Sequence, residues 1–132
     1  MTIGEVAKES GLAASAIRFY EQAGVLPKAI RISGRRQYDR SILEMLAVLG
    51  RAKTCAFSLA ETRQLFYGFR EDAPPSQRWQ TLGHRKTIEL DDMGRKIAGI
   101  KKLLQRSCAC KDLAECGRRI RAEKKHAPGA AP

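Results

Sequence analysis

The strongest constraint on the fold is a long heptad pattern that follows two adjacent prolines. Pro74 and Pro75 end any preceding helix, and Ser76 can cap a new helix that extends to about Arg106. Apolar and small side chains alternate by four and three residues, in an a/d register over four heptads: Trp79, Gly83, Lys86, Leu90, Met93, Ile97, Ile100 and Leu104. We therefore predict one dimerisation helix over residues 76–106, roughly 45 Å long.

Such a helix carries an apolar stripe that another surface has to cover. The rest of this 132-residue chain offers no second helix of comparable length, so we predict that the same helix of a second copy covers it, as a homodimer. The alternative is that the stripe packs on the chain's own N-terminal segment. Gly83, Gly94 and Gly99 weaken the predicted helix, and Lys86 weakens the apolar a/d contact between two such helices.

Two short helices are expected at the N-terminus. Thr2 and Glu5 fit a capping box that begins a helix over residues 3–9, and Gly11 fits a turn that needs a positive φ. A second helix is expected over residues 14–22. Two helices joined by a glycine turn within about twenty residues have the spacing of a helix-turn-helix.

A β-hairpin is expected directly after these helices. Residues 30–38 break the helical period, and a Ser33-Gly34 turn separates two short extended pieces. Arginines 31, 35 and 36 gather around its tip, which makes the hairpin a basic wing.

Two further helices complete a winged helix-turn-helix domain over residues 1–70. Asp39 is a suitable N-cap for a helix over residues 40–53, and Ser58 with Glu61 forms a second capping box for a helix that reaches about Phe69. The predicted fold class is thus mainly α, with one small hairpin.

The charge of the chain favours a polyanionic partner. Lys and Arg number 25 against 14 Asp and Glu, a net charge of +11 spread along the whole chain. We find no run of about 18 apolar residues and no signal-peptide pattern at the N-terminus, so we expect no membrane span and a cytoplasmic protein.

A cysteine cluster follows the predicted long helix. Cys108, Cys110 and Cys116 form a C-x-C-x5-C pattern, which suits a soft metal ion, and nearby Arg and Lys side chains are expected to lower the thiol pKa values. In a cytoplasmic chain such cysteines favour metal or redox chemistry over disulfides. We assign residues 107–121 to an effector-binding loop and residues 122–132 to a disordered tail, and we expect Cys55 to be a small buried residue.

Four blocks of this sequence, in this order and spacing, resemble the MerR family of transcriptional regulators. They are IGEVA at residues 3–7, IRFYEQAGVLP at 17–27, GRRQY at 34–38 and FSLAE at 57–61. The long helix and the trailing cysteines fit the same family, so the resemblance covers residues 1 to about 121.

The resemblance implies a homodimer in which the long helices pair as an antiparallel coiled coil. Each winged helix-turn-helix would read half of a double-stranded promoter site, and the effector-bound dimer would distort the DNA so that RNA polymerase can use the promoter. The candidate DNA-binding residues are Ala14, Ser15, Arg18, Tyr20, Arg31, Arg35, Arg36 and Tyr38. Of these, Ala14 and Ser15 begin the recognition helix and would face base edges, whereas the others would hold phosphates.

The resemblance leaves two kinds of effector open. Metal-responsive members use cysteines in this loop to hold Hg, Zn, Cu or a similar ion, and those that bind divalent ions usually add a partner-chain cysteine at the start of the long helix. Here residues 74–76 read Pro-Pro-Ser. The SoxR branch holds a [2Fe–2S] cluster, but its first cysteine would fall at Gln105, for which His84 of the partner subunit could substitute.

Two other classes of protein remain as alternatives. A thiol oxidoreductase could use Cys108 and Cys110, although the chain lacks the βαβ context of such enzymes. An architectural DNA-binding protein with a structural zinc would bind DNA equally with and without the ion. We find no paired catalytic carboxylates and no phosphate-binding glycine loop, so we expect no enzymatic activity.

Overall fold

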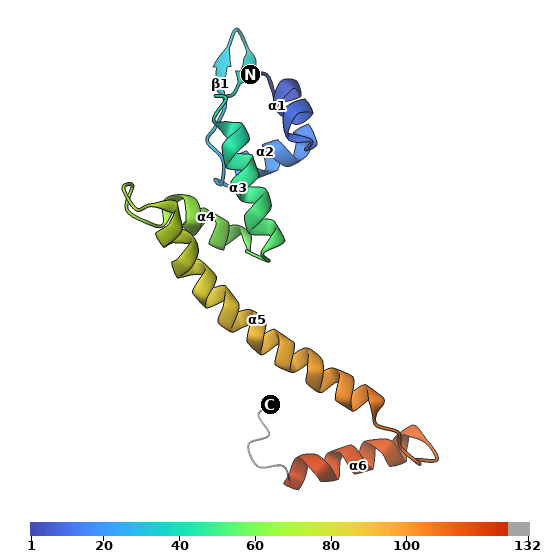
Figure 1. The fold of residues 1–132 in the computed structure, drawn as a ribbon. Coiled ribbons are helices and arrows are strands. Elements are labelled where there is room, and N and C mark those ends of the chain that lie inside the picture. The colour runs from blue at the N-terminus through green and yellow to red at the C-terminus, as the bar shows by residue number, and fades with distance from the viewer. Residues whose placement is uncertain (127–132) are drawn as a thin grey trace. The chain divides into compact units, whose positions relative to one another are not determined.

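The computed structural model describes residues 1–126 of the protein (Figure 1). The elements in chain order are α1 (Ile3–Ser10), α2 (Ala14–Gln22), β1 (Ile30–Ile32), β2 (Arg35–Gln37), α3 (Ile42–Thr54), α4 (Leu59–Tyr67), α5 (Pro75–Gln105) and α6 (Leu113–His126). The chain divides into two units, residues 1–89 and the residues from Leu90 onward, with α5 continuing through the boundary. The mainly helical fold with one small hairpin confirms the predicted fold class.

The helix-turn-helix forms as its capping signals predict. The Thr2 hydroxyl accepts a bond from the Glu5 amide at 3.2 Å, and the Glu5 carboxylate accepts one from the Thr2 amide at 2.8 Å. Gly11 ends α1 with φ 75°, a conformation that costs glycine little. The chain can therefore turn sharply from α1 into α2.

The hairpin is held against the start of α1. Ser33 and Gly34 both have positive φ, 52° and 78°, which is the geometry of a tight two-residue hairpin turn. The Tyr38 amide donates to the Met1 carbonyl at 2.6 Å, and the Met1 ammonium group donates to the Tyr38 carbonyl at 2.7 Å. These bonds fix the wing beside the two helices.

A single apolar cluster joins α1, α2, the hairpin and α3. Its buried members are Val6, Ile17, Val25, Leu26, Tyr38, Ile42, Leu46 and Leu49. The third helix begins at Ile42, two residues later than predicted, because the Asp39 carboxylate accepts from the Ser41 amide and residues 40 and 41 form a turn.

A second buried cluster joins the end of α3 to α4 and the first turns of α5. It contains Ala52, Phe57, Leu65 and Leu82, with Trp79 packed against it. Helix α5 begins at Pro75 rather than after a Ser76 cap, since proline at the first helical position sacrifices no hydrogen bond. The N-terminal part of the apolar stripe thus packs on the chain's own N-terminal unit, as in the alternative considered above.

Lys86 is the clearest departure from a coiled-coil seam. Its side chain is buried, and its ammonium group donates to the carboxylates of Glu61 and Glu89, each at 2.9 Å. Glu61 also completes the capping box of α4 with Ser58. Lys86 therefore connects α5 to α4 within the first unit instead of facing a second copy.

The second unit differs from the first in the solvent exposure of its side chains. From Leu90 onward the apolar side chains of α5 are exposed, and no residue from 90 to 124 is buried. The expected boundaries at the C-terminus are wrong: α6 begins at Leu113, inside the predicted loop, and continues through residues 122–126 of the predicted tail. Residues 127–132 lie outside the described part of the chain. Within that described part, no helix is both long and apolar enough to cross a membrane.

Candidate DNA-binding surface and metal centre

Helix α2 presents part of the predicted DNA-binding set. Ser15 and Arg18 are exposed, and Ala14 is partly exposed at the first position of the helix. Tyr20 is half-buried and packs against the apolar cluster of the first unit. The first three side chains are therefore accessible to a ligand, whereas most of the Tyr20 ring serves the core.

The arginines of the wing divide into two kinds. Arg31 and Arg35 are exposed near the tip, where Arg31 donates to the Gly34 carbonyl at 3.3 Å. Arg36 is only partly exposed, because its guanidinium lies 3.4 Å from the carboxylate of Glu21. Arg31 and Arg35 are free to meet a phosphate, but Arg36 is already engaged with a carboxylate.

The prediction for Tyr38 requires correction. Its side chain is 5 % exposed, and its hydroxyl donates to the Glu21 carboxylate at 2.8 Å. Burial and the neighbouring Glu21 carboxylate raise the pKa of Tyr38 above its usual value of 10.0. This tyrosine belongs to the core and not to the surface that could face DNA.

Glu21 is the organising residue that the sequence reasoning missed. It is buried, and one carboxylate oxygen accepts from the Ala29 amide at 2.8 Å while the other accepts from Tyr38 and Arg36. Its position, four residues after the buried Ile17, places it on the inner face of α2. That spacing is the signal that could have identified it.

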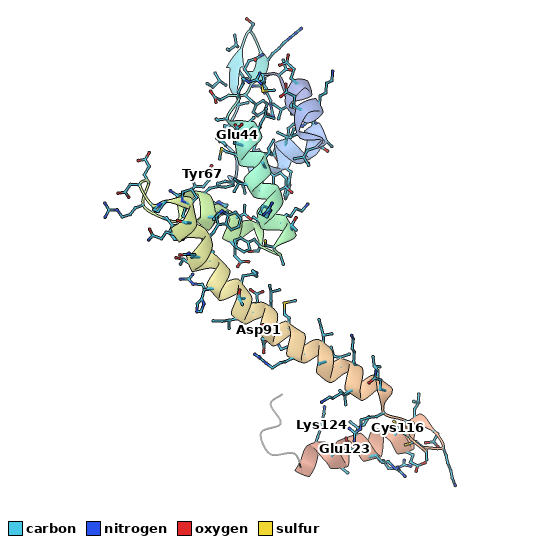
Figure 2. The ribbon with its side chains drawn as sticks, viewed as in Figure 1. Glu44, Tyr67, Asp91, Cys116, Glu123 and Lys124 are labelled. Atoms are coloured by element: carbon cyan, nitrogen blue, oxygen red, sulfur yellow. The ribbon has the colours of Figure 1, made fainter. Side chains whose placement is uncertain are left out.

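The three predicted metal ligands lie together at the start of α6. The sulfur atoms of Cys108, Cys110 and Cys116 all lie within 4.8 Å of one another. Cys116 stands in the first turns of α6 (labelled in Figure 2), and the other two belong to the segment between α5 and α6. The structure thus brings the three sulfur atoms together.

A capping arrangement at the start of α6 holds the thiols in place. The Asp112 carboxylate accepts from the Glu115 amide at 2.8 Å, and the Glu115 carboxylate accepts from the Lys111 amide at 2.9 Å. An acidic residue followed three positions later by Glu is the usual signature of a helix start, so this helix could have been predicted. The cap fixes the direction from which Cys116 approaches the other two thiols.

The electrostatic environment differs between the thiols. Hydrogen bonds from the backbone and then the side chain of Cys110 lower the pKa of Cys108 below its usual value of 9.0. Burial, followed by the hydrogen bond and charge of Cys108, raises the pKa of Cys110 to about 11. The expectation that nearby cations lower every thiol pKa is therefore wrong for Cys110, although the direction holds for Cys108.

The donor set fits a soft metal ion. Two sulfurs on one tetrahedral zinc with bonds of about 2.3 Å lie about 3.8 Å apart, so separations of at most 4.8 Å need only a small inward movement. The thiols also border a hollow of about 690 Å³, whose other lining includes Leu103, Ile120, Arg106 and Arg119. The arrangement can bind a thiophilic cation with ligands from one chain.

Other candidate ligands lie elsewhere. Cys55 is exposed at the C-terminal end of α3, which corrects the expectation of a buried residue. His84 is exposed on α5 in the first unit. Gln105, the last residue of α5, occupies the place where an iron–sulfur pattern would have its first cysteine.

Comparisons with known proteins agree with this geometry. Residues 2–38 match the model of the family described as MerR family regulatory protein. The HTH-type transcriptional regulator CueR of Escherichia coli O157:H7 is 32 % identical over 124 residues, covering 88 % of this chain and 89 % of the relative. The heavy metal-dependent transcription regulator 2 of Rhizobium meliloti (strain 1021) is 32 % identical over 104 residues, covering 78 % of this chain and 69 % of the relative.

A solved structure shares the fold over most of the chain. It is the transcription regulator PbrR691 from Ralstonia metallidurans CH34 in complex with lead(II), with a TM-score of 0.71 and 26 % identity, and the match covers 85 % of this chain and 91 % of that protein. These relatives are transcription regulators. On the strength of the sequence blocks, the fold and these relatives, the chain belongs to the MerR family of regulatory proteins.

Proposed function

We propose that this protein binds promoter DNA as a homodimer and regulates transcription in response to a thiophilic metal ion held by Cys108, Cys110 and Cys116. The observation that carries the proposal is the convergence of the three sulfur atoms within 4.8 Å in a chain of this family. That cluster supplies an effector site, and the exposed basic side chains of the first unit supply a DNA-binding surface.

DNA recognition is assigned to α2 and the wing. Ser15 on α2 is exposed and can reach a base edge, while Arg18 on the same helix can hold a phosphate. Arg31 and Arg35 at the wing tip add two more positive charges without a carboxylate partner among residues 1–124. This distribution separates base reading by the helix from phosphate binding by the wing.

The second half of α5 supports the homodimer. Leu90, Met93, Ile97, Ile100 and Leu104 keep the predicted a/d spacing and are all exposed. An apolar stripe of this length on a single helix is covered most simply by its equivalent in a second copy. The antiparallel pairing of two such helices, distortion of the promoter and its use by RNA polymerase belong to the same proposal.

The ion would be held by thiolate sulfur, the ligand that Hg, Cu, Zn and Pb bind strongly. Once bound, it supplies bonds that join Cys116 in α6 to the segment that precedes the helix. Because Cys110 has a raised pKa, its thiol would have to lose a proton in order to serve as a thiolate ligand.

The test is an anaerobic purification followed by elemental analysis and a visible spectrum of the same sample. Apo protein is incubated with Hg(II), Cu(I), Zn(II) or Pb(II), and excess ion is removed by gel filtration. We expect a colourless protein that retains a soft ion, and we expect Cys116→Ser to lose it. Cys55→Ser is the matched control and retains the ion, since Cys55 lies apart from the cluster.

Two results would contradict the metal assignment. Visible charge-transfer bands with stoichiometric iron would place the protein with [2Fe–2S] redox sensors. A colourless protein that retains no ion would leave thiol oxidation as the chemistry of the cluster. DNA regulation is tested separately, by selecting bound fragments from genomic DNA and transcribing those promoters with RNA polymerase, with and without the ion.

A further inference from the structure

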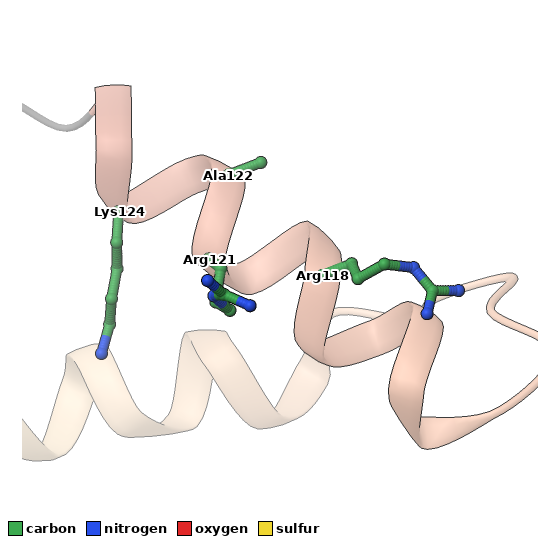
Figure 3. A pocket seen from close by; sticks show the side chains of 4 residues that line it. All are labelled: Arg118, Arg121, Ala122 and Lys124. Carbon is green, nitrogen blue, oxygen red and sulfur yellow. The ribbon is translucent and has the colours of Figure 1, made fainter.

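Helix α6 has two faces with different surroundings. Cys116, Arg119, Ile120 and Glu123 line the hollow beside the thiols. Arg118, Arg121, Ala122 and Lys124 line another open hollow of about 560 Å³ (Figure 3), and Lys124 also borders the hollow beside the thiols. At 100° per residue, Arg118 and Arg121 lie nearly opposite Cys116, so the helix turns a basic face away from the metal centre.

The cations of this basic face, Arg118, Arg121 and Lys124, have no acidic partner. All three are exposed, and none forms an ion pair with any residue from 1 to 124. Their neighbour Arg119 differs, since it lies 3.3 Å from the Glu115 carboxylate on the other side of the helix. The positive charge of the basic face is therefore available to an external anion.

The net charge of residues 101–125 also favours an anionic partner. Residues 101–125 contain nine Lys or Arg and three Asp or Glu, a steeper excess than in the chain as a whole. The basic face itself offers only Ala122 as an apolar group. Protein interfaces depend on buried aromatic or aliphatic anchors, whereas contacts to nucleic-acid phosphates need cations alone.

We infer that the basic face of α6 binds backbone phosphates of double-stranded DNA, as a contact additional to the winged helix-turn-helix. The inference rests on the proposed function, which already brings a duplex to this protein. Arg118 and Arg121 are about 4.5 Å apart along the helix axis, and a duplex carries one charge per about 1.7 Å of its length, so both can find phosphates irrespective of base sequence.

The test compares two double variants of the full-length protein on a mixed-sequence duplex. Arg118→Gln with Arg121→Gln neutralises the basic face, and Arg95→Gln with Lys96→Gln removes two charges from α5 that already pair with Asp92. Both pairs lower the net charge equally, and glutamine preserves helix propensity. Affinity is measured by fluorescence anisotropy at several salt concentrations, after circular dichroism and ion retention have confirmed the fold.

We expect the salt dependence of binding to weaken for the α6 variant alone. Each lost phosphate contact reduces the slope of log K against log salt by about 0.9, so two contacts reduce it by about 1.8 per protomer. An unchanged slope in the folded α6 variant overturns the inference. So does an α6 variant that binds DNA normally but no longer activates transcription, because its partner would then be a protein.

The same measurement separates this inference from the proposed function. Arg35→Gln serves as the wing variant, because Arg35 is exposed at the tip. If Arg35→Gln weakens binding and the α6 variant does not, the proposed function stands and the inference fails. If the wild-type protein itself does not bind the duplex, the proposed function fails as well.

Discussion

At the scale of single residues, Glu21 determines how the wing is attached to the recognition helix. It accepts bonds from the Ala29 amide, the Tyr38 hydroxyl and the Arg36 guanidinium, and it is itself buried. The hydrogen bonds from these donors replace those to water that the carboxylate loses when it is buried. Removing it leaves the buried Tyr38 hydroxyl, and the partly buried Ala29 amide and Arg36 guanidinium, without this acceptor.

Glu21→Ala should therefore lower the free energy of unfolding by about 1–3 kcal/mol, the usual cost of unsatisfied buried polar groups. The measurement is a urea titration followed by circular dichroism. Glu44→Ala is the control, since Glu44 is exposed on α3 (Figure 2) and should change the value by less than about 0.5 kcal/mol. Equal effects of the two substitutions would contradict the role assigned to Glu21.

The two neighbouring wing arginines should separate DNA binding from stability. Arg35→Ala removes an exposed charge and should reduce the salt slope of DNA binding by about 0.9 without changing the urea midpoint. Arg36→Ala should instead lower the urea midpoint, because Arg36 is paired with Glu21. A wing whose two variants leave DNA binding intact at every salt concentration would not be a contact surface.

Glu61 contributes to the pH dependence of stability. Burial raises its pKa, but bonds from Ser58 and Lys86 outweigh burial, so the pKa lies below the usual value of 4.5. A lowered folded-state pKa stabilises the protein above about pH 4.5, and this stabilisation is lost as the pH falls through the folded pKa.

Glu61→Gln removes this charge and keeps a residue that can complete the capping box. We expect the variant to unfold at a lower urea concentration than the wild type at neutral pH. The difference between the two proteins should shrink as the pH falls below about 4.5. A difference that is constant over this range would mean that the Glu61 charge does not stabilise the fold.

At the scale of elements, the two halves of α5 lie in different surroundings. Its first turns pack through Trp79 and Leu82 on α3 and α4, and Arg78 donates to backbone carbonyls at the end of α4 and in the following loop. From Leu90 onward, the same helix exposes its apolar side chains. One continuous helix thus combines an intramolecular anchor with an exposed apolar stripe.

Ile97→Glu tests that surface, because it places a charge in the middle of the exposed stripe. We expect the variant to sediment as a monomer under conditions where the wild type is a dimer. Ala98→Glu adds the same charge at the adjacent exposed position outside the a/d register, and it should remain a dimer. Dimers of both variants would show that the stripe is not the interface.

At the scale of the whole molecule, the two units differ in how many buried side chains they contain. Residues 1–89 contain both buried apolar clusters, whereas residues 90–124 contain no buried side chain. A unit without a buried core depends on a partner or a ligand for its stability.

Hydrogen exchange should reveal this inequality. Dilution below the dimer dissociation constant should remove amide protection from the second half of α5 and from α6, while α1 and α3 stay protected. Adding the soft ion to the diluted protein should restore protection around Cys116 in the wild type but not in Cys110→Ser. Loss of protection in both units together would show that they unfold as one.

Local signals in the sequence determined most of the secondary structure. The capping boxes at Thr2 and Ser58, the turn at Gly11 and the Ser33-Gly34 hairpin depend on neighbouring residues, so they could be predicted before the structure was known. The convergence of the three thiols is local for the same reason, since all three lie within a stretch of nine residues.

Only the tertiary structure decided which face of each local element is used. The burial of Tyr38, the hub at Glu21 and the inward Lys86 all depend on groups 15 or more residues away in sequence. A local pattern can place Glu21 on the inner face of α2, but it does not identify these partners, because the free energy of a buried polar group depends on the groups that the fold brings to it. Sequence periodicity placed Lys86 in a seam, and packing against Glu61 placed it in the interior of one chain.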